Sequence, residues 1–249
     1  MPLTRPWHHA AVPDRRTLRG AHPKDRECFS PAAVETLRRA VDDLSWLLGR
    51  GYSAKAALKL VGDRHALRDR QRKALQRCAA SDEDCARRRG NRLAPAELEG
   101  EPLVVDGYNV LLTVEAALSG GVLLLGRDRV LRDLAAMSRH YRRVTVTRRA
   151  VDLVAAVVAE AGCARVRWLL DRPVSNSGRL GALVEDRVAG VGPPWTVELT
   201  DRTDQVLAEA PEVVASADSA VLDRCRRWTN LARHVVQASV PDPWIVDLG

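Results

Sequence analysis

The sequence predicts an α/β protein in which a parallel-sheet domain follows a small, basic, all-helical domain. Three observations support this class. Apolar residues recur every three or four positions across residues 31–80, which is typical of amphipathic helices. From residue 102 onward, short apolar runs alternate with helical stretches, which is typical of a parallel sheet covered by helices. The net charge of +7 lies in the first part, because residues 1–100 hold 21 Lys and Arg against 13 Asp and Glu, and residues 101–249 hold 18 against 19.

The first hundred residues divide into an arm, a helical domain and a linker. Residues 1–30 contain four prolines and little periodicity, so we expect an extended arm. The helical domain spans residues 31–80 and opens where Ser30 caps a helix with Pro31 in its first position. Residues 81–101 are polar, with Gly, Pro and mixed charge, which predicts a linker. The expected helices cover residues 31–49, 54–62 and 65–79.

The remaining residues, 102–249, form the expected sheet domain. Its strands read as continuous apolar runs because helices cover both faces of a parallel sheet. The last nine residues, 241–249, are expected to be a loosely packed extension. The apolar runs lie at residues 103–105, 122–125, 143–147, 168–170, 195–200, 213–217 and 234–239.

Composition and charge narrow the class of protein further. The longest uncharged run has eleven residues, 116–126, whereas a membrane span needs roughly 20, so we expect no membrane contact. The first residues lack the apolar stretch of a secretion signal, and the five scattered cysteines fit reduced thiols in the cytoplasm. The basic first part predicts a polyanionic partner, of which nucleic acid is the commonest.

Three of the apolar runs are each followed at once by an aspartate, namely Asp106, Asp171 and Asp218. Ligands of parallel α/β sheets bind at the carboxyl ends of the strands. Asp204 lies between the last two, near the start of an expected helix. Carboxylates that converge on one edge repel one another unless a cation neutralises them, and oxygen ligands suit Mg²⁺ or Mn²⁺. Each aspartate by itself also suits a helix N-cap, Asp218 above all.

Other α/β folds with the same alternation of strands and helices have characteristic sequence motifs, and this sequence lacks those motifs. The text DGYNVL after the first strand has no G-x-G-x-x-G, and Asp106-Gly107-Tyr108 is not the D-x-D of a phosphatase. No lysine follows Lys73, which argues against a P-loop and a receiver domain, and G-x-S-x-G is absent. Cys78 and Cys85 do not have the spacing of a zinc site.

The text VVDGYNVL resembles the first-strand motif of the PIN-like nucleases, specifically their NYN branch. The resemblance covers about residues 103–239 and implies a PIN-like fold with metal ligands at Asp106, at Asp171 in WLLDRP and at Asp218 in ASADSAVLDR. It implies a further ligand at Asp204, where the surrounding text matches the family only loosely. Residues 15–90 are similar to a basic helical domain of unknown function that precedes some NYN-like domains.

This resemblance implies a Mg²⁺- or Mn²⁺-dependent ribonuclease, because such ions activate water and stabilise the charge that develops during phosphodiester cleavage. Asn109 either orients a water or a phosphate, or is a turn residue. Ser175, Asn176 and Ser177 precede a helix whose free N–H groups suit a phosphate, or they cap that helix. Asp128, which follows the apolar run 122–125, is expected as a surface or capping residue, with a place near the site as the alternative.

The helical domain is expected to bind the RNA through the basic residues of its third helix. We therefore expect a cytoplasmic ribonuclease, with a homodimer as one option for its assembly. The alternatives are a non-catalytic RNA-binding or adaptor protein that keeps the fold, and a protein-interaction module. The expected RNA-binding residues of the helical domain are Arg64, Arg68, Arg72, Lys73 and Arg77.

Overall fold

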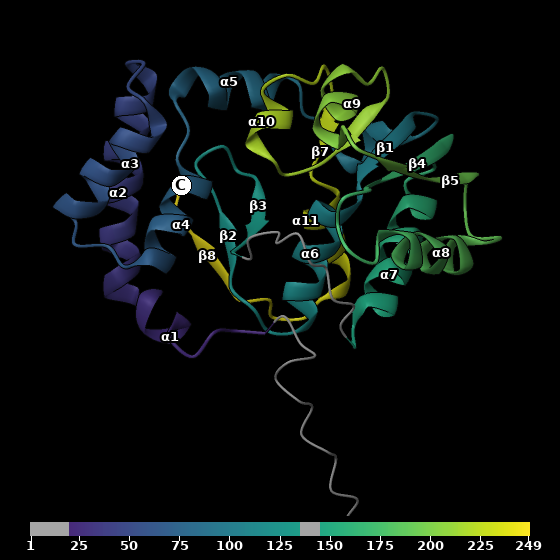
Figure 1. Cartoon of the computed structure of the whole chain (residues 1–249), viewed down its shortest axis with the longest axis horizontal. Coiled ribbons are helices and arrows are strands. Elements are labelled where there is room, and N and C mark those ends of the chain that lie inside the picture. Colours follow the sequence, from purple (N-terminus) through teal and green to yellow (C-terminus); the bar gives the residue numbers. More distant parts are fainter. Residues whose placement is uncertain (1–19, 135–144) are drawn as a thin grey trace, which may run out of the picture.

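The computed structural model describes residues 20–134 and 145–249, and its centre is a sheet of five strands that all run parallel (Figure 1). The strand order is β5-β4-β1-β6-β7, so β1 lies in the middle. A helical region precedes this sheet, which confirms the predicted α/β class. The strands are β1 (Pro102–Asp106), β4 (Arg165–Asp171), β5 (Trp195–Thr200), β6 (Val213–Ala215) and β7 (Trp228–Thr229).

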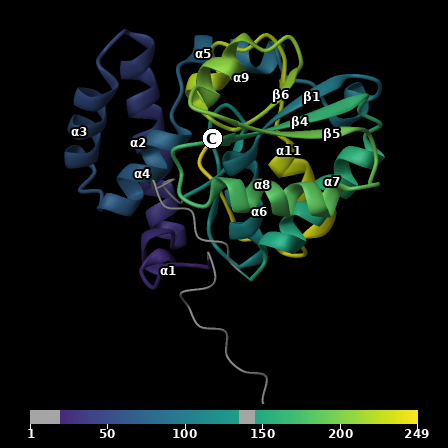
Figure 2. The ribbon, with the colours of Figure 1, turned by 45° about the vertical axis from the view of Figure 1, so that its right-hand side comes forward.

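Helices cover both faces of this main sheet, as the apolar strands predict. Alternate side chains of β1 point to opposite faces, so Leu103 and Val105 join one core and Val104 joins the other. The first core is closed by α6 (Gly107–Leu118), α7 (Thr147–Glu160), α8 (Ser177–Val188) and α11 (Leu231–Ser239). The apolar run 234–239 is thus helical, not a strand as predicted, and residues 143 and 144 of the run 143–147 lie outside the described residues. The second core is closed by α9 (Thr203–Glu209) and α10 (Ser219–Leu222). Figure 2 shows α7 and α8 beneath the sheet and α9 above it.

The N-terminal region is helical where the sequence predicts it. Of the arm predicted for residues 1–30, residues 1–19 lie outside the described residues, and the rest holds one short helix. The bundle is packed through apolar faces that include Leu37, Val61 and Leu75. Its helices are α1 (Asp25–Cys28), α2 (Pro31–Gly49), α3 (Ala54–Arg64) and α4 (Asp69–Cys78).

The segment 81–101 differs from the linker that its composition suggests. It holds the helix α5 (Asp82–Gly90) and a 3₁₀ turn, η2 (Pro95–Leu98). Ser81 caps α5 by accepting a hydrogen bond from the Asp84 backbone N–H at 3.0 Å. Acidic residues fill the first turn of α5 and arginines fill its last turn, which suits the helix dipole. The segment looks like a linker because its charges are frequent, but their order favours a helix.

A second, three-stranded sheet has the order β3-β2-β8 and joins the helical region to the main sheet domain. The run 122–125, expected in the main sheet, contributes β2 here, and the tail 241–249 contributes β8 through a parallel pairing with β2. The tail is therefore not a loose extension. Val122, Leu124 and Val246 share one apolar core with the N-terminal helices. The strands are β2 (Leu123–Leu125), β3 (Leu131–Asp133) and β8 (Ile245–Asp247).

Two general features bear on function. In the part of the chain that the structure describes, no helix has the length and apolar character needed to cross a membrane. All five cysteines are buried and free.

Candidate functional site

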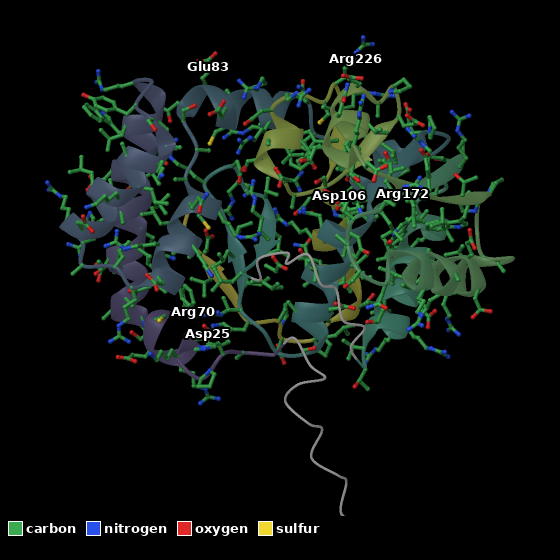
Figure 3. All side chains as sticks on the ribbon, viewed as in Figure 1. Asp25, Arg70, Glu83, Asp106, Arg172 and Arg226 are labelled. Carbon is green, nitrogen blue, oxygen red and sulfur yellow. The ribbon has the colours of Figure 1, made fainter. Side chains whose placement is uncertain are left out.

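The predicted aspartates lie at the carboxyl edge of the main sheet. Asp106 ends β1 and Asp171 ends β4, and the register aligns Asp106 with Leu169, so the two strand ends are neighbours. Asp218 follows β6, which is the other neighbour of β1. Asp204 lies in the first turn of α9. Figure 3 shows Asp106 at this edge, with Arg172, the residue after Asp171, close by in this view.

Hydrogen bonds fasten the end of β1 to the loop that follows β6. The Ser216 hydroxyl donates to Asp106 Oδ2 at 2.7 Å and accepts a bond from the Asp218 backbone N–H at 3.1 Å. The Asn109 side-chain oxygen accepts from the Ala217 backbone N–H at 2.8 Å. Asp106 also caps α6 by accepting a longer bond from the Asn109 backbone N–H at 3.4 Å. The positions of Asp106, Asn109 and Asp218 are therefore set by one network.

The carboxylates act on one another electrostatically. Burial raises the pKa of Asp106 to about 7, the charges of Asp218 and Asp171 add to this rise, and hydrogen bonds from Ser216 and Asn109 oppose it. Burial also raises the pKa of Asp204, again with contributions from Asp218 and Asp171. We call the four aspartates the acidic group, in which the negative charges of Asp171 and Asp218 disfavour the ionisation of Asp106 and Asp204.

The donor set of this acidic group suits a hard divalent cation, because it consists of carboxylate oxygens without His or Cys. Among residues 20–134 and 145–249, however, no group of three or more His, Cys, Asp and Glu is arranged closely enough to hold an ion. Binding of Mg²⁺ or Mn²⁺ by Asp106, Asp171, Asp204 and Asp218 would thus require these side chains to move toward one another.

The raised pKa of Asp106 predicts a pH-dependent stability. Its folded-state pKa of about 7 exceeds the value of 3.8 expected when it is unfolded, so its contribution to stability is full below about pH 4 and is lost as the pH rises toward 7. Asp106→Asn removes this titration. In EDTA at about pH 8, we expect the free energy of unfolding of the variant to exceed that of the wild type by up to a few kcal/mol, and its melting temperature to be correspondingly higher. The gain should shrink toward about pH 4.

The control for this measurement is Asp186→Asn, which changes an exposed aspartate on α8. It is expected to shift the melting temperature little at either pH. A gain for Asp106→Asn that is equal at both ends of the pH range would contradict the assignment of the raised pKa.

A cavity of about 420 Å³ adjoins the acidic group. Lys73, Gln76 and Arg77 line it from α4, and Asn109 and Asp218 line it from the sheet domain. The structure thus brings two of the predicted RNA-binding residues to the edge that carries the predicted catalytic residues. This proximity is set by the second sheet, whose strand β2 packs against α4.

The other predicted basic residues do not line this cavity. Arg64 and Arg68 precede α4, which begins only at Asp69, and they form ion pairs with Asp43 and Glu27. Arg72 pairs with Asp63 of α3 at 2.7 Å. These three arginines therefore do not line the cavity, and their contact with RNA stays a prediction. Arg72 faces α3, whereas Lys73 and Arg77 face the cavity. Arg70, also on α4, pairs with Asp25, and Figure 3 shows this pair far from Asp106.

The segment Ser175–Ser177 follows β4, four residues after Asp171, but does not line the cavity. Asn176 has a left-handed backbone with φ of 67°, which asparagine tolerates well, and Ser177 begins α8. The Ser177 hydroxyl donates to the Arg172 carbonyl oxygen at 3.3 Å. These contacts fix the turn between β4 and α8, and they leave the predicted phosphate contact untested.

Asp128 does not belong to the acidic group. It is buried, and Arg132 and Arg88 both donate to its carboxylate, at 2.6 and 2.7 Å. Burial acts to raise the pKa of Asp128, but the hydrogen bonds and charges of Arg132 and Arg88 outweigh this effect and hold that pKa below its usual value. Its role is therefore to neutralise two buried arginines.

Sequence reasoning missed the residues that support the site. Arg132 is buried and donates to the Ala217 carbonyl oxygen at 2.8 Å and to the Ser219 hydroxyl at 3.2 Å, so it holds the loop that carries Asp218. Ser216 lies within the quoted text ASADS and was detectable as a polar residue at a strand end. Arg132 gave no such signal, because its partners are distant in sequence.

Fold and site together define a Rossmann-like α/β protein with an acidic group at the carboxyl edge of its sheet. The chain belongs to the family described as Domain of unknown function (DUF5616), whose model matches residues 95–234. A second model, described as Protein of unknown function (DUF434), matches residues 36–90. The first match begins after α5, and the second ends with it, so α5 goes with the helical region.

One relative is similar over most of the chain. It is the uncharacterized protein MJ0935 of Methanocaldococcus jannaschii, which is 25% identical over 187 residues, or 75% of this chain and 89% of that protein. No solved structure matches the chain. These comparisons name no activity, so the chain's own residues are the basis for a functional proposal.

Proposed function

We propose that the protein is a Mg²⁺- or Mn²⁺-dependent ribonuclease whose N-terminal helical region contributes to RNA binding. The observation that carries this proposal is the acidic group of Asp106, Asp171, Asp204 and Asp218 beside a cavity lined by Lys73 and Arg77. Excess negative charge at a sheet edge favours a bound cation, and neighbouring basic side chains favour a phosphate. The resemblance of residues 103–239 to NYN nucleases supports the same function.

The roles of the side chains follow from their contacts. A divalent ion at such a site supplies an activated water and stabilises charge on the phosphate. Ser216 and Asn109 hold Asp106 in place, and burial, with the charges of Asp218 and Asp171 added to it, raises the pKa of Asp106, so a bound cation would favour its ionised form. Lys73 and Arg77 are placed to bind the RNA backbone next to Asp218.

We further propose that the protein works in the cytoplasm. Five free, buried cysteines fit a reducing compartment, because oxidising compartments favour disulfides in small secreted domains.

The proposal is tested by incubating the full-length protein with single-stranded RNA in Mg²⁺, in Mn²⁺ and in EDTA. We expect cleavage in one or both metals and none in EDTA. Asp106→Asn is expected to reduce the rate by at least about a hundredfold, which is the size of effect seen when one group that stabilises transition-state charge is lost. Asp186→Asn, with the same chemical change on an exposed helix, should cleave at the wild-type rate. Near-normal cleavage by Asp106→Asn would rule out the proposed site.

A second candidate is a non-catalytic RNA-binding protein, and one observation favours it. Among the described residues the carboxylates are not gathered closely enough for an ion. Melting in millimolar Mn²⁺ against EDTA separates the two functions, because an ion that binds only the folded state stabilises by about 2.7 kcal/mol at a hundredfold excess over Kd. The nuclease predicts a rise that Asp106→Asn loses, and the non-catalytic protein predicts RNA binding without that rise.

A further inference from the structure

The cavity between α4 and the sheet edge is rich in hydrogen-bond donors. Lys73, Gln76 and Arg77 supply ammonium, amide and guanidinium groups from one side, and Asn109 supplies an amide from the other. The Asn109 side-chain oxygen is already bonded to the Ala217 backbone N–H, which leaves its amide nitrogen available as a donor. Among the lining residues that the structure describes, Asp218 is the one carboxylate. A cavity with this lining suits an anion with several acceptor oxygens.

Lys73 differs from the other cations of the cavity. Arg77 contacts Asp133 at 3.3 Å, and Arg132 is buried against Asp128. Lys73 is exposed and makes no hydrogen bond or ion pair with any residue that the structure describes. Its charge therefore remains available to a ligand, and its exposure means that its replacement does not threaten the fold.

The position of the cavity limits which phosphate of an RNA enters it. The N-terminal helices stand to one side of the main sheet (Figures 1 and 2), and α4 forms the wall of the cavity on that side. Leu134 and Arg132 also line it. A strand that crosses the edge with Asp171, Asp106 and Asp218 toward α4 meets this wall, so we expect its end to lie here.

We propose that this cavity binds the terminal phosphate of an RNA chain. This inference rests on the proposed RNA substrate but not on cleavage. A terminal phosphate carries up to two negative charges and three free oxygens, whereas an internal phosphodiester carries one charge, so adjacent ammonium and guanidinium groups favour the terminal group.

The test is a competition for binding to full-length protein in EDTA, where no cleavage interferes. One labelled single-stranded RNA is displaced by unlabelled RNAs of the same sequence with hydroxyl ends, with a 5′-phosphate or with a 3′-phosphate. We expect one phosphorylated form to compete about tenfold better than the hydroxyl form, since a charge-assisted hydrogen bond contributes an effect of this order. The phosphorylated RNA that competes better identifies which end of the chain the cavity binds.

The variant Lys73→Gln is expected to lose this preference, and the matched variant Lys55→Gln to keep it. Lys55 is also an exposed lysine of the helical region, on α3, and it does not line the cavity. Equal competition by all three RNAs, a preference that survives in Lys73→Gln, or no RNA binding at all would overturn the inference. A preference without cleavage in Mn²⁺ would retain the inference and reject the nuclease.

Discussion

Replacement of Arg88 by methionine is expected to destabilise the folded protein by about 3–5 kcal/mol, the usual cost of removing one partner from a buried ion pair. Arg88 is 3% exposed and donates two bonds of 2.7 Å to the Asp223 carboxylate and one of 2.7 Å to Asp128. Its own carbonyl oxygen accepts from the buried Trp228 indole at 2.8 Å. Methionine fills a similar volume but leaves Asp128 with Arg132 alone.

The matched control is Arg64→Met, because Arg64 meets Asp43 at 3.5 Å on an exposed surface. Exposed ion pairs contribute about 0–1 kcal/mol, so this variant should unfold at nearly the wild-type denaturant concentration. Urea unfolding of both variants and the wild type measures the difference. Equal midpoints for Arg88→Met and Arg64→Met would show that the buried network does not stabilise the fold. Arg88 and Arg132 share the Asp128 carboxylate, and Arg132 holds the Ala217–Ser219 loop. If the protein cleaves RNA as proposed, Arg88→Met should therefore also slow that cleavage beyond its effect on stability.

Replacement of Gly107 by alanine is expected to destabilise the protein by about 2–3 kcal/mol or more, as an added methyl group does in a tightly packed core. A Cβ atom at this position would lie 2.5 Å from the Leu169 carbonyl oxygen and closer still to the Trp168 indole nitrogen. Both atoms belong to β4 in the centre of the main sheet, and a strand carbonyl cannot move without breaking its ladder. The first helical position after Asp106 therefore requires glycine.

Gly178→Ala is the control for this substitution. Gly178 lies in α8, and a Cβ atom added there would meet nothing within 4 Å. Alanine at an open helical position is more stable than glycine by roughly 0.5–1 kcal/mol, so this variant should melt at or above the wild-type temperature. A Gly107→Ala protein with unchanged melting temperature and RNA cleavage would contradict the close packing of α6 on β4.

The structure gives physical reasons for the residues of DGYN, which in the sequence alone are only a resemblance to a family motif. Asp106 caps α6 and faces the carboxyl edge, Gly107 lets α6 approach β4, and Asn109 reaches across to the Ala217 backbone. Three of these four residues thus have a structural role at the junction of β1, β4 and β6. A catalytic role for Asp106 is compatible with this structural role, and the cleavage assay of Asp106→Asn tests it.

The sequence predicted the main-sheet strands around residues 103–105, 168–170 and 213–217 because strand periodicity and composition are local properties. The aspartates at their ends followed, since parallel strands bring their carboxyl ends to one edge. The run 122–125 shows the limit of this reasoning. Four apolar residues predict a strand, but its partner β8 comes from the far end of the chain, so no local pattern specifies the sheet that it joins.

The sequence by itself thus determined the α/β class, the helical region and the acidic group at the sheet edge. Only the tertiary structure decided which cations face that edge and which charges are buried. Lys73 lines the same cavity as Asp218 because α4 packs on the second sheet, and Arg88 binds Asp223 across 135 positions of the chain. Such pairings depend on the docking of distant elements, and an arginine that will be buried looks in sequence like one that will stay in water.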